Sequence, residues 1–344
     1  MTARTLSLNY ITLNMKINII GCGLSGITSA ILLKEQGHNV EIFESRPHIG
    51  GNCYDKKKSG ITVHQYGAHI FHTSDEDVWT FLNRYSKFNN YSHKVRANTK
   101  LGLISIPYSK KTSEQIGRDL SPTEIQELIF RAYSERHWGI PWENLPKSIS
   151  GRVPNKRGNY DDRYFTDTYQ GIPENGYTEM IKNMLDGIKV NVGVNKDEYR
   201  KLKCDKIVYT GKPDEFFDFS HGRLPYRSLK FEHFKADKDD NFSFSKGSVI
   251  NECNSMPYNR TIDNGVFLNE NLPYTIMTRD HPCEHDETND PIYPKNFGEG
   301  QEIYKKYKRA IDADPNVIFL GRLATYKYLD MWMAIKQVMV KLSG

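Results

Sequence analysis

The stretch from Lys16 to Glu44 restricts the possible folds more than any other part of the sequence. An isoleucine-rich run ends in the glycine turn GCGLSG at 21–26, and apolar residues at helical spacing follow from Ile27. A second apolar run begins at Asn39 and ends on Glu44. This order of strand, glycine turn, helix and strand predicts the first half of a dinucleotide-binding βαβ unit.

The glycines of this turn and the acid after it have separate physical roles. Gly21 permits the tight turn, Gly23 lets the backbone approach a pyrophosphate, and Gly26 lets the helix pack on the strand. The N–H groups at the start of the helix favour an anion. Glu44 stands close to the ~20 residues past the last glycine at which an acid binds a ribose hydroxyl. A chance glycine-rich turn is the alternative, but the complete pattern favours a dinucleotide site.

Composition limits the remaining possibilities. With 344 residues, of which 38% are hydrophobic, the chain can form two or three domains. Its five cysteines are scattered without a CxxC pair, which predicts neither a disulfide framework nor a zinc site and indicates a reducing compartment. No apolar run reaches the ~18 residues that span a bilayer, so we expect a cytoplasmic protein. The net charge of +5 favours small anionic ligands over nucleic acid.

A second group of glycines follows the acid. Arg46 stands two residues after Glu44, where its guanidinium could meet a phosphate or a purine, and Gly50–Gly51–Asn52 suits a close backbone approach to a ligand. An ordinary glycine turn is the alternative. Together with the first motif, the run SRPHIGGN (45–52) resembles the FAD-binding family of the glutathione-reductase and amine-oxidase type. The resemblance implies FAD rather than NAD.

The polar segment from Lys147 to Gly171 has the composition of a surface loop. It could also hold a diphosphate and a base, because guanidinium groups fit phosphate oxygens and the segment contains several aromatic rings. The residues concerned are Arg152, Lys156, Arg157, Arg163, Tyr160, Tyr164 and Tyr169.

A strand-to-helix turn late in the chain offers another ligand contact. The buried-type strand 317–321 leads to Arg322, whose position suits the FAD phosphates or the reduced ring. Asp330 then precedes a helix with apolar residues at helical spacing.

Six further segments sharpen the resemblance. They are YGAHIFHT (66–73), YSERHWG (133–139), DDRYFTDTYQGIPENGYTEMI (161–181), PYRSLKFE (225–232), DPIYP (290–294) and GRLATYKYLDM (321–331). In combination they resemble the UDP-galactopyranose mutase family from Lys16 to Val340, nearly the whole chain. The resemblance implies that reduced FAD interconverts the pyranose and furanose forms of a nucleotide-bound galactose. It also implies flavin N5 as the nucleophile and a role in galactofuranose biosynthesis for cell-surface polysaccharide.

The resemblance assigns contacts to individual residues. For the cofactor they are Gly21, Gly23, Gly26, Glu44, Arg46, Gly51, Asn52, His69, Arg227, Arg322 and Asp330. For the substrate they are Tyr133, Trp138, Arg157, Tyr164, Tyr169, Asn251, Arg260, Tyr293 and Tyr328. The catalytic group comprises Arg157, Arg260, His69, Tyr293 and Tyr328, with His69 acting largely through its backbone. No metal is expected, because His69 and His72 would face opposite sides of a strand.

The lid loop departs from the family pattern by one residue. Counting forward from Arg152–Val153–Pro154 places the family's lid arginine at Lys156, whereas counting backward from Tyr164–Phe165 places it at Arg157. We expect Arg157, because a bidentate guanidinium holds a diphosphate in a defined direction and a lysine ammonium does not.

We therefore predict an α/β fold in three parts. A discontinuous Rossmann-type FAD-binding domain comprises 15–85, 187–222 and 315–344, and Met1–Asn14 is an extension or an upstream start. A small helical domain comprises 106–146, in which the capping box Ser121–Pro122–Thr123–Glu124 begins a helix that ends at Trp138. An antiparallel β-sheet domain for the substrate comprises 86–105, 147–186 and 223–314, with the lid at 150–163. The helical insertion is several turns shorter than in bacterial mutases, so the oligomeric state is left open.

Three alternatives stay open. A mutase could act on another nucleotide hexose, since the same clamp would hold its diphosphate. An amine-oxidase-type FAD oxidoreductase shares the glycine fingerprint but should lack paired arginines and tyrosines for a diphosphate. A non-catalytic flavoprotein would bind a nucleotide sugar without converting it. The expected partners are the nucleotide sugar and a reductant such as NAD(P)H or a reductase, with no nucleic acid and no membrane.

Overall fold

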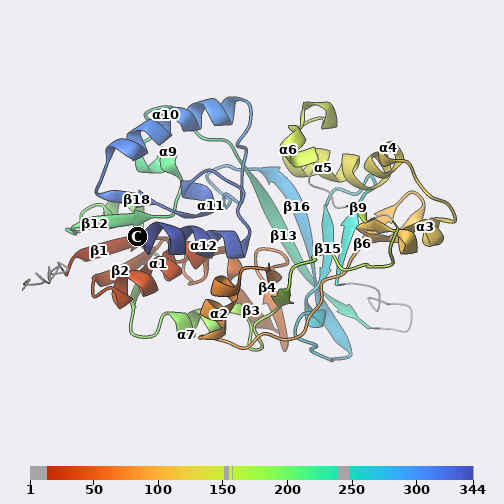
Figure 1. Cartoon of the computed structure of the whole chain (residues 1–344), viewed down its shortest axis with the longest axis horizontal. Coiled ribbons are helices and arrows are strands. Elements are labelled where there is room, and N and C mark those ends of the chain that lie inside the picture. Colours follow the sequence, from red (N-terminus) through yellow and green to blue (C-terminus); the bar gives the residue numbers. More distant parts are fainter. Residues whose placement is uncertain (1–13, 151–154, 157, 239–247, 344) are drawn as a thin grey trace, which may run out of the picture.

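Two sheets dominate the computed structural model, which describes residues 14–150, 155–156, 158–238 and 248–343 (Figure 1). One is five-stranded and the other is seven-stranded. Figure 1 shows the five-stranded sheet at one end of the molecule, the seven-stranded sheet in the middle and a group of helices beyond it. No helix in the described ranges is long and apolar enough to cross a membrane.

The five-stranded sheet is parallel throughout, with the order β11–β2–β1–β12–β18. Its strands are Lys189–Val192 (β11), Asn39–Glu44 (β2), Lys16–Ile20 (β1), Lys206–Tyr209 (β12) and Val317–Phe319 (β18). Helix α1, Leu24–Glu35, follows β1 and is buried along most of its length, because α12, Met331–Leu342, packs against it. The predicted strand, turn, helix and strand are therefore confirmed.

The carboxyl ends of these strands meet at one edge of the sheet, where parallel α/β sheets bind ligands. At this edge two glycines of the turn have no room for a side chain. Gly21 has a φ of +104°, and a Cβ there would lie 2.0 Å from Thr210 Oγ1. A Cβ on Gly26 would lie 2.0 Å from the carbonyl oxygen of Gly21. Both glycines are needed for the turn to pack at all.

The seven-stranded sheet has the order β17–β13–β16–β15–β14–β6–β7 and is antiparallel except where β14 meets β6. Its strands are Tyr293–Pro294 (β17), Tyr226–Asp237 (β13), Tyr274–Glu284 (β16), Arg260–Asp263 (β15), Val249–Glu252 (β14), Val95–Thr99 (β6) and Gly102–Ile106 (β7). The long β13–β16 pair forms the wall that faces the five-stranded sheet (Figure 1).

The helical segment begins with α3, Lys110–Ile116, and continues with α4, Pro122–Ile125. The predicted capping box is present: Ser121 Oγ accepts from the N–H of Glu124, and the Glu124 carboxylate accepts from the N–H of Ser121. A π-helical turn, Gln126–Phe130, then leads into α5, Arg131–Trp138. The sequence predicted one continuous helix here and did not indicate the π turn.

Short elements complete the chain. The paired strands are β3 (Asp55–Lys58) with β4 (Ile61–His64), β5 (Phe71–Thr73) with β10 (Tyr169–Gly171), and β8 (Tyr108–Ser109) with β9 (Asn155–Lys156). The helices are α2 (Glu76–Asn83), α6 (Lys147–Ser150), α7 (Tyr177–Met184), α8 (Lys196–Tyr199), α9 (Pro213–Phe216), α10 (Glu299–Ala313) and α11 (Gly321–Ala324). The proposed domain boundaries remain a prediction.

Two local expectations are wrong. The segment predicted as a loop after Lys147 contains helix α6 and contributes strands β9 and β10 to small sheets. His69 does not lie on a strand, because residues 65–70 form the connection between β4 and β5. The argument that His69 and His72 face opposite sides of a strand therefore does not hold.

Candidate functional site

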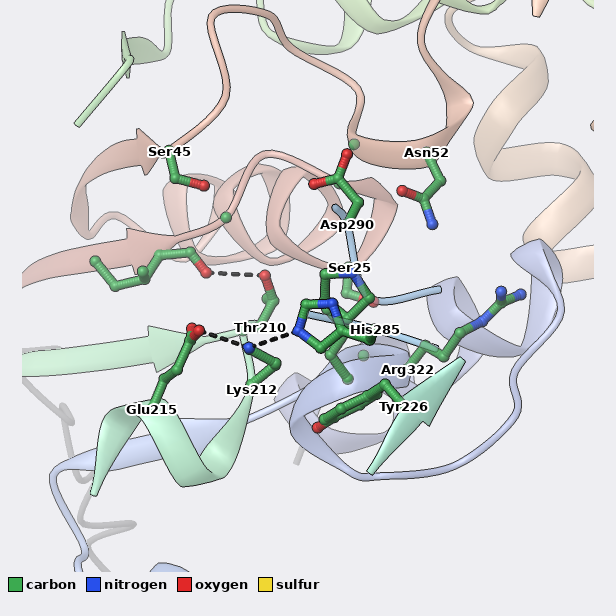
Figure 2. A pocket seen from close by; sticks show the side chains of 18 of the residues that line it. Ser25, Ser45, Asn52, Thr210, Lys212, Glu215, Tyr226, His285, Asp290 and Arg322 are labelled. Atoms are coloured by element: carbon green, nitrogen blue, oxygen red, sulfur yellow. Dashed lines mark hydrogen bonds and ion pairs between the residues drawn. The ribbon is translucent and has the colours of Figure 1, made fainter. Parts of the chain in front are cut away.

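A cavity of about 970 Å³ opens at the carboxyl edge of the parallel sheet (Figure 2). Its walls come from the glycine turn, the ends of β2, β12 and β18, and the chain that leads into β17. Nine of the residues predicted to bind the cofactor line it, namely Gly21, Gly23, Glu44, Arg46, Gly51, Asn52, His69, Arg322 and Asp330. Gly26 instead provides the close packing of α1 on the turn.

The glycine turn provides a cradle for an anion. No side chain caps α1 and no acidic residue stands in its first turn, so the N-terminal N–H groups and the helix dipole favour negative charge. A Cβ on Gly23 would meet nothing nearer than the Cα of Gly51 at 4.0 Å, which leaves backbone open to a ligand. These features fit a dinucleotide pyrophosphate.

Glu44 is held in place by backbone donors at the end of β2. Its carboxylate accepts hydrogen bonds from the N–H of Cys22 at 2.7 Å and from the N–H of Arg46 at 2.9 Å. The side chain is buried and lines the cavity. Because each carboxylate oxygen can accept more than one hydrogen bond, Glu44 can still bind a ribose hydroxyl.

Arg46 bridges two walls of the cavity. Its Nε and one Nη lie 3.0 Å from Asp290 Oδ1, and the other Nη donates to Asn52 Oδ1 at 3.0 Å. The guanidinium also lies over the Tyr66 ring, 4.5 Å from its centroid. Most of its donors are therefore engaged by the protein, and its contact with a phosphate or purine remains a prediction.

The wall of the cavity carries a second bridge. Lys212, after β12, donates from Nζ to His285 Nε2 at 2.9 Å and pairs with Glu215 at 2.6 Å (Figure 2). Burial lowers the pKa of His285, so its ring is neutral and can accept this bond. The Tyr226 hydroxyl, buried in the same wall, has no hydrogen-bond partner among the described residues. A ligand or water can therefore satisfy it.

Arg322 lies where the cavity meets a group of aromatic side chains. Its Nε donates to the carbonyl oxygen of Leu329 at 3.0 Å. The guanidinium lies 5.7 Å from the ring centroid of Tyr293 and 4.9 Å from that of Tyr328. These two rings are parallel, with centroids 6.0 Å apart.

Arg260 is the centre of the predicted substrate residues. Its Nε donates to the hydroxyl of Tyr133 at 2.8 Å. Tyr133 stacks on His137, and His137 meets the edge of Tyr293 at 4.6 Å, so an aromatic chain joins Arg260 to the Arg322 group. Trp138 also packs edge-on against Tyr293. Neither Nη of Arg260 has a partner among the described residues, which leaves both for an anion.

His69 lies at the junction of the two regions. It lines the cavity, and both Arg322 and Arg260 act on its ring electrostatically. Burial is the main cause that lowers the pKa of His69 to about 3, and the two cations lower it further. The imidazole is therefore neutral at physiological pH.

The other predicted substrate residues differ in how they relate to Arg260. Tyr164 donates its backbone N–H to the carbonyl oxygen of His93 at 2.8 Å. Burial raises the pKa of its hydroxyl, and the positive charge of Arg260 acts to lower it. Asn251 stands directly opposite Arg260 across β14 and β15. Tyr169 stacks on Trp79 at 4.9 Å, which is a packing contact. Arg157 lies outside the described residues.

Arg227 has a different setting from that expected. It is 4% exposed and does not line the cavity. Its guanidinium donates to the carbonyl oxygens of His137 and Arg136 at 2.7 and 2.8 Å, and it pairs with Glu284 at 2.7 Å. The side chain thus anchors the end of α5, while its contact with the cofactor remains a prediction.

Sequence reasoning missed three polar groups that the fold brings to the site. They are Asp280 behind Arg260, His64 behind His69, and the Lys212–His285 pair. A carboxylate inside the strand-like run TIMTRDHP was an available signal for Asp280, because isolated charges are uncommon in buried strands.

Comparison with known proteins identifies the family. The sequence model of the UDP-galactopyranose mutase family matches residues 128–328, and that of an NAD(P)-binding Rossmann-like domain matches 19–85. The dTDP-fucopyranose mutase of Escherichia coli is 35% identical over 94% of this chain and 96% of its own length. The chain belongs to the UDP-galactopyranose mutase family. It is therefore an enzyme, a mutase with a Rossmann-type dinucleotide-binding domain in an α/β fold.

Other relatives agree on the reaction class but not on the substrate. A probable UDP-galactopyranose mutase of Klebsiella pneumoniae is 32% identical over 95% of this chain and 93% of its own length. The crystal structure of a reduced UDP-galactopyranose mutase superposes with a TM-score of 0.74 at 13% identity, covering 96% of both chains. Putrescine oxidase shares the fold at a TM-score of 0.58 and 12% identity. The names of the relatives differ in both nucleotide and sugar.

Proposed function

We propose that the protein binds FAD in the cavity and, with the flavin reduced, interconverts the pyranose and furanose forms of a nucleotide sugar. The observation that carries the proposal is the continuity between the glycine-turn cavity and the Arg260 group through His69, Arg322 and the tyrosines. When bound and reduced, FAD supplies the nucleophile that this site otherwise lacks.

The residues of the cavity are suited to hold FAD. The N–H groups at the start of α1 would receive the pyrophosphate, and Glu44 would bind the ribose. Arg322, Asp330 and His69 line the same cavity. The putrescine oxidase fold is consistent with a flavin here but does not carry a substrate assignment.

The residues beyond the cavity are suited to hold a sugar diphosphate. Arg260 presents two Nη groups, and Tyr133 fixes its Nε so that the fork has a defined orientation. Tyr293 and Tyr328 present polar hydroxyls on rings that stack with each other. As the sugar–phosphate bond breaks, the leaving diphosphate gains charge, and stabilising this charge is the main task of Arg260 and of Arg157 in the lid.

UDP-galactopyranose and UDP-galactofuranose are the first substrate pair to test, and another nucleotide hexose such as a dTDP-linked sugar is the second. The E. coli relative named as a dTDP-fucopyranose mutase motivates the second choice. A reductant such as NAD(P)H or a reductase, and a cytoplasmic location, complete the proposal.

A panel of nucleotide furanoses incubated with FAD-loaded, dithionite-reduced protein tests the function. We expect the matching pyranose to appear by chromatography and no net consumption of reductant. Consumption of oxygen or NAD(P)H in proportion to product would favour an amine-oxidase-type reaction. Binding of UDP or dTDP without any isomer would favour a non-catalytic flavoprotein.

A further inference from the structure

His64 lies at the end of β4 and has no role in the proposed function, but its side chain is hydrogen-bonded to a residue of the site. Its Nδ1 accepts from the backbone N–H of His69 at 3.1 Å. The imidazole is 2% exposed and stacks on Phe267 with ring centroids 4.8 Å apart and an interplanar angle of 16°. Its own backbone N–H donates to Asn264 Oδ1 at 3.1 Å. The ring therefore has a single well-defined position.

The protonation state of His64 follows from this setting. Burial lowers its pKa to about 3, so the ring is neutral at physiological pH. Because Nδ1 accepts, the proton of the neutral ring is on Nε2. Nε2 has no hydrogen-bond partner among the described residues, so the bond to His69 is the contact that the ring makes through its nitrogens. Losing this bond would leave the Nδ1 atom of a buried ring and the backbone N–H of His69 without their partner.

The bond holds one end of a tight turn that faces the cavity. Gly67 has a φ of +85°, and the His69 ring bonds through Nδ1 to the carbonyl oxygen of Gly67 at 2.9 Å. The ring of His69 is thus fixed relative to its own turn, and His64 fixes the turn relative to β4. Since His69 lines the cavity and the charges of both Arg260 and Arg322 act on its ring, a shift of this turn would change a wall that both ligand regions share.

We infer that His64 is a positioning residue: its Nδ1 holds the backbone of His69 where the cofactor cavity meets the Arg260 group. The inference rests on the proposed function, because it assigns the flavin to the cavity that His69 lines. The operative property of His64 is the acceptor at the Nδ1 position, not the size of its ring.

Three variants separate these properties. His64→Asn keeps an acceptor near the position of Nδ1, whereas His64→Leu keeps volume without an acceptor. Phe267→Leu is the matched control, since it disturbs the packing of the His64 ring but leaves its hydrogen bond. Hydrogen exchange of the peptide that contains His69, the midpoint potential of the bound flavin, and kcat and KM are measured for each.

For His64→Leu we expect faster exchange at His69, a shifted flavin potential and a kcat lower by roughly threefold to tenfold with KM within about twofold. His64→Asn should restore all three towards the wild-type values. Phe267→Leu should lower the melting temperature without shifting the potential.

A His64→Leu protein that loses only thermal stability would overturn the inference, as would a His64→Asn protein that behaves like His64→Leu. If His64→Leu does not fold, His64→Gln replaces it, because the Gln amide reaches the Nε2 position and should leave the His69 N–H without its acceptor. The exchange rate and the potential do not depend on turnover. They therefore test His64 even if the wild-type protein isomerises none of the sugars.

Discussion

Arg260 and Asp280 stand directly opposite each other on strands β15 and β16, with Nε of the arginine 3.6 Å from Oδ2 of the aspartate. Asp280 is 1% exposed, and burial raises the pKa of its carboxyl although Arg260 acts to lower it. The separation is longer than a hydrogen bond, and Tyr133 rather than Asp280 holds Nε. The carboxylate therefore offsets the charge of Arg260 more than it orients the side chain.

Asp280→Asn should tighten the binding of a nucleoside diphosphate. One unit charge about 8 Å from a phosphate contributes about 2 kcal/mol at an effective dielectric constant of about 20, so we expect roughly thirtyfold tighter binding of UDP at low salt. Calorimetry at low and high salt measures this, and salt should reduce the gain. Glu232→Gln, which removes a carboxylate beside Arg279 on the same sheet, is the control and should change little. Weaker binding by Asp280→Asn would show that the aspartate orients Arg260 after all.

Glu44→Ala should lose most of the flavin and also destabilise the apoprotein. The substitution removes the proposed ribose contact and leaves the N–H groups of Cys22 and Arg46 without their acceptor, which costs roughly 1–3 kcal/mol for each that stays buried. The ratio of flavin to protein absorbance and the thermal unfolding of the apoprotein report the two effects separately. Glu41→Gln, on the same strand but paired with Lys189, should retain its flavin. A fully yellow Glu44→Ala protein would exclude the assigned ribose contact.

The protein should lose stability steeply in mild acid because of four histidines. Burial lowers the pKa of His64, His69, His93 and His137 from 6.5 to about 3. Above pH 6.5 neither state binds these protons and there is no loss. As the pH falls below about 6.5, the unfolded chain binds protons that the folded chain excludes, and stability drops by up to about 1.4 kcal/mol per pH unit for each histidine.

Urea unfolding midpoints between pH 7.5 and 4.5 measure this loss. The loss should level off only near pH 3, where the folded protein takes up the same protons. His93→Gln should flatten the curve by about one quarter, since it removes one of four histidines with the same shift. A midpoint that does not change between pH 7 and 5 would contradict the buried neutral state of these rings.

Arg157→Ala should lower kcat/KM by roughly tenfold to a hundredfold while leaving flavin content intact, since a hydrogen bond to a charged group contributes roughly 1.5–3 kcal/mol. Lys156→Ala should cost much less, because a lysine is a point charge that neighbouring cations can partly replace. Steady-state kinetics of both variants decide between them. Equal losses would indicate a shared clamp, and a larger loss for Lys156→Ala would reverse the assignment of the lid residue.

Features encoded locally in the sequence were predicted well. The glycine turn, the helix after it and the Ser121 capping box depend on residues within a few positions of each other, so spacing alone identifies them. Helix α10, Glu299–Ala313, was missed although Ile303, Tyr307 and Ile311 lie four residues apart on one face. The π turn after α4 was missed because its cause is tertiary packing rather than a local pattern.

In the candidate site, too, the locally encoded residues were predictable and the tertiary contacts were not. Residues that the strand ends deliver to the cavity, such as Glu44 and Arg322, were predictable from strand boundaries. The partnership of Asp280 with Arg260 depends on the register of two antiparallel strands, and that of His64 with His69 depends on a turn between two short strands. No periodicity in the sequence encodes either pairing, because only the folded backbone brings the paired groups together.

The parallel sheet takes its strands from three separate stretches of chain, and the edge strand β18 comes from the last of them. During synthesis β12 would therefore present an unpaired edge until residues 317–319 have emerged, and such edges invite pairing with other chains. Arg322 and Asp330 emerge later still, so the cavity has an open wall until then. We therefore expect the cavity to bind the proposed flavin only once the chain is finished, and flavin supplied after synthesis should be captured as fully as flavin present throughout.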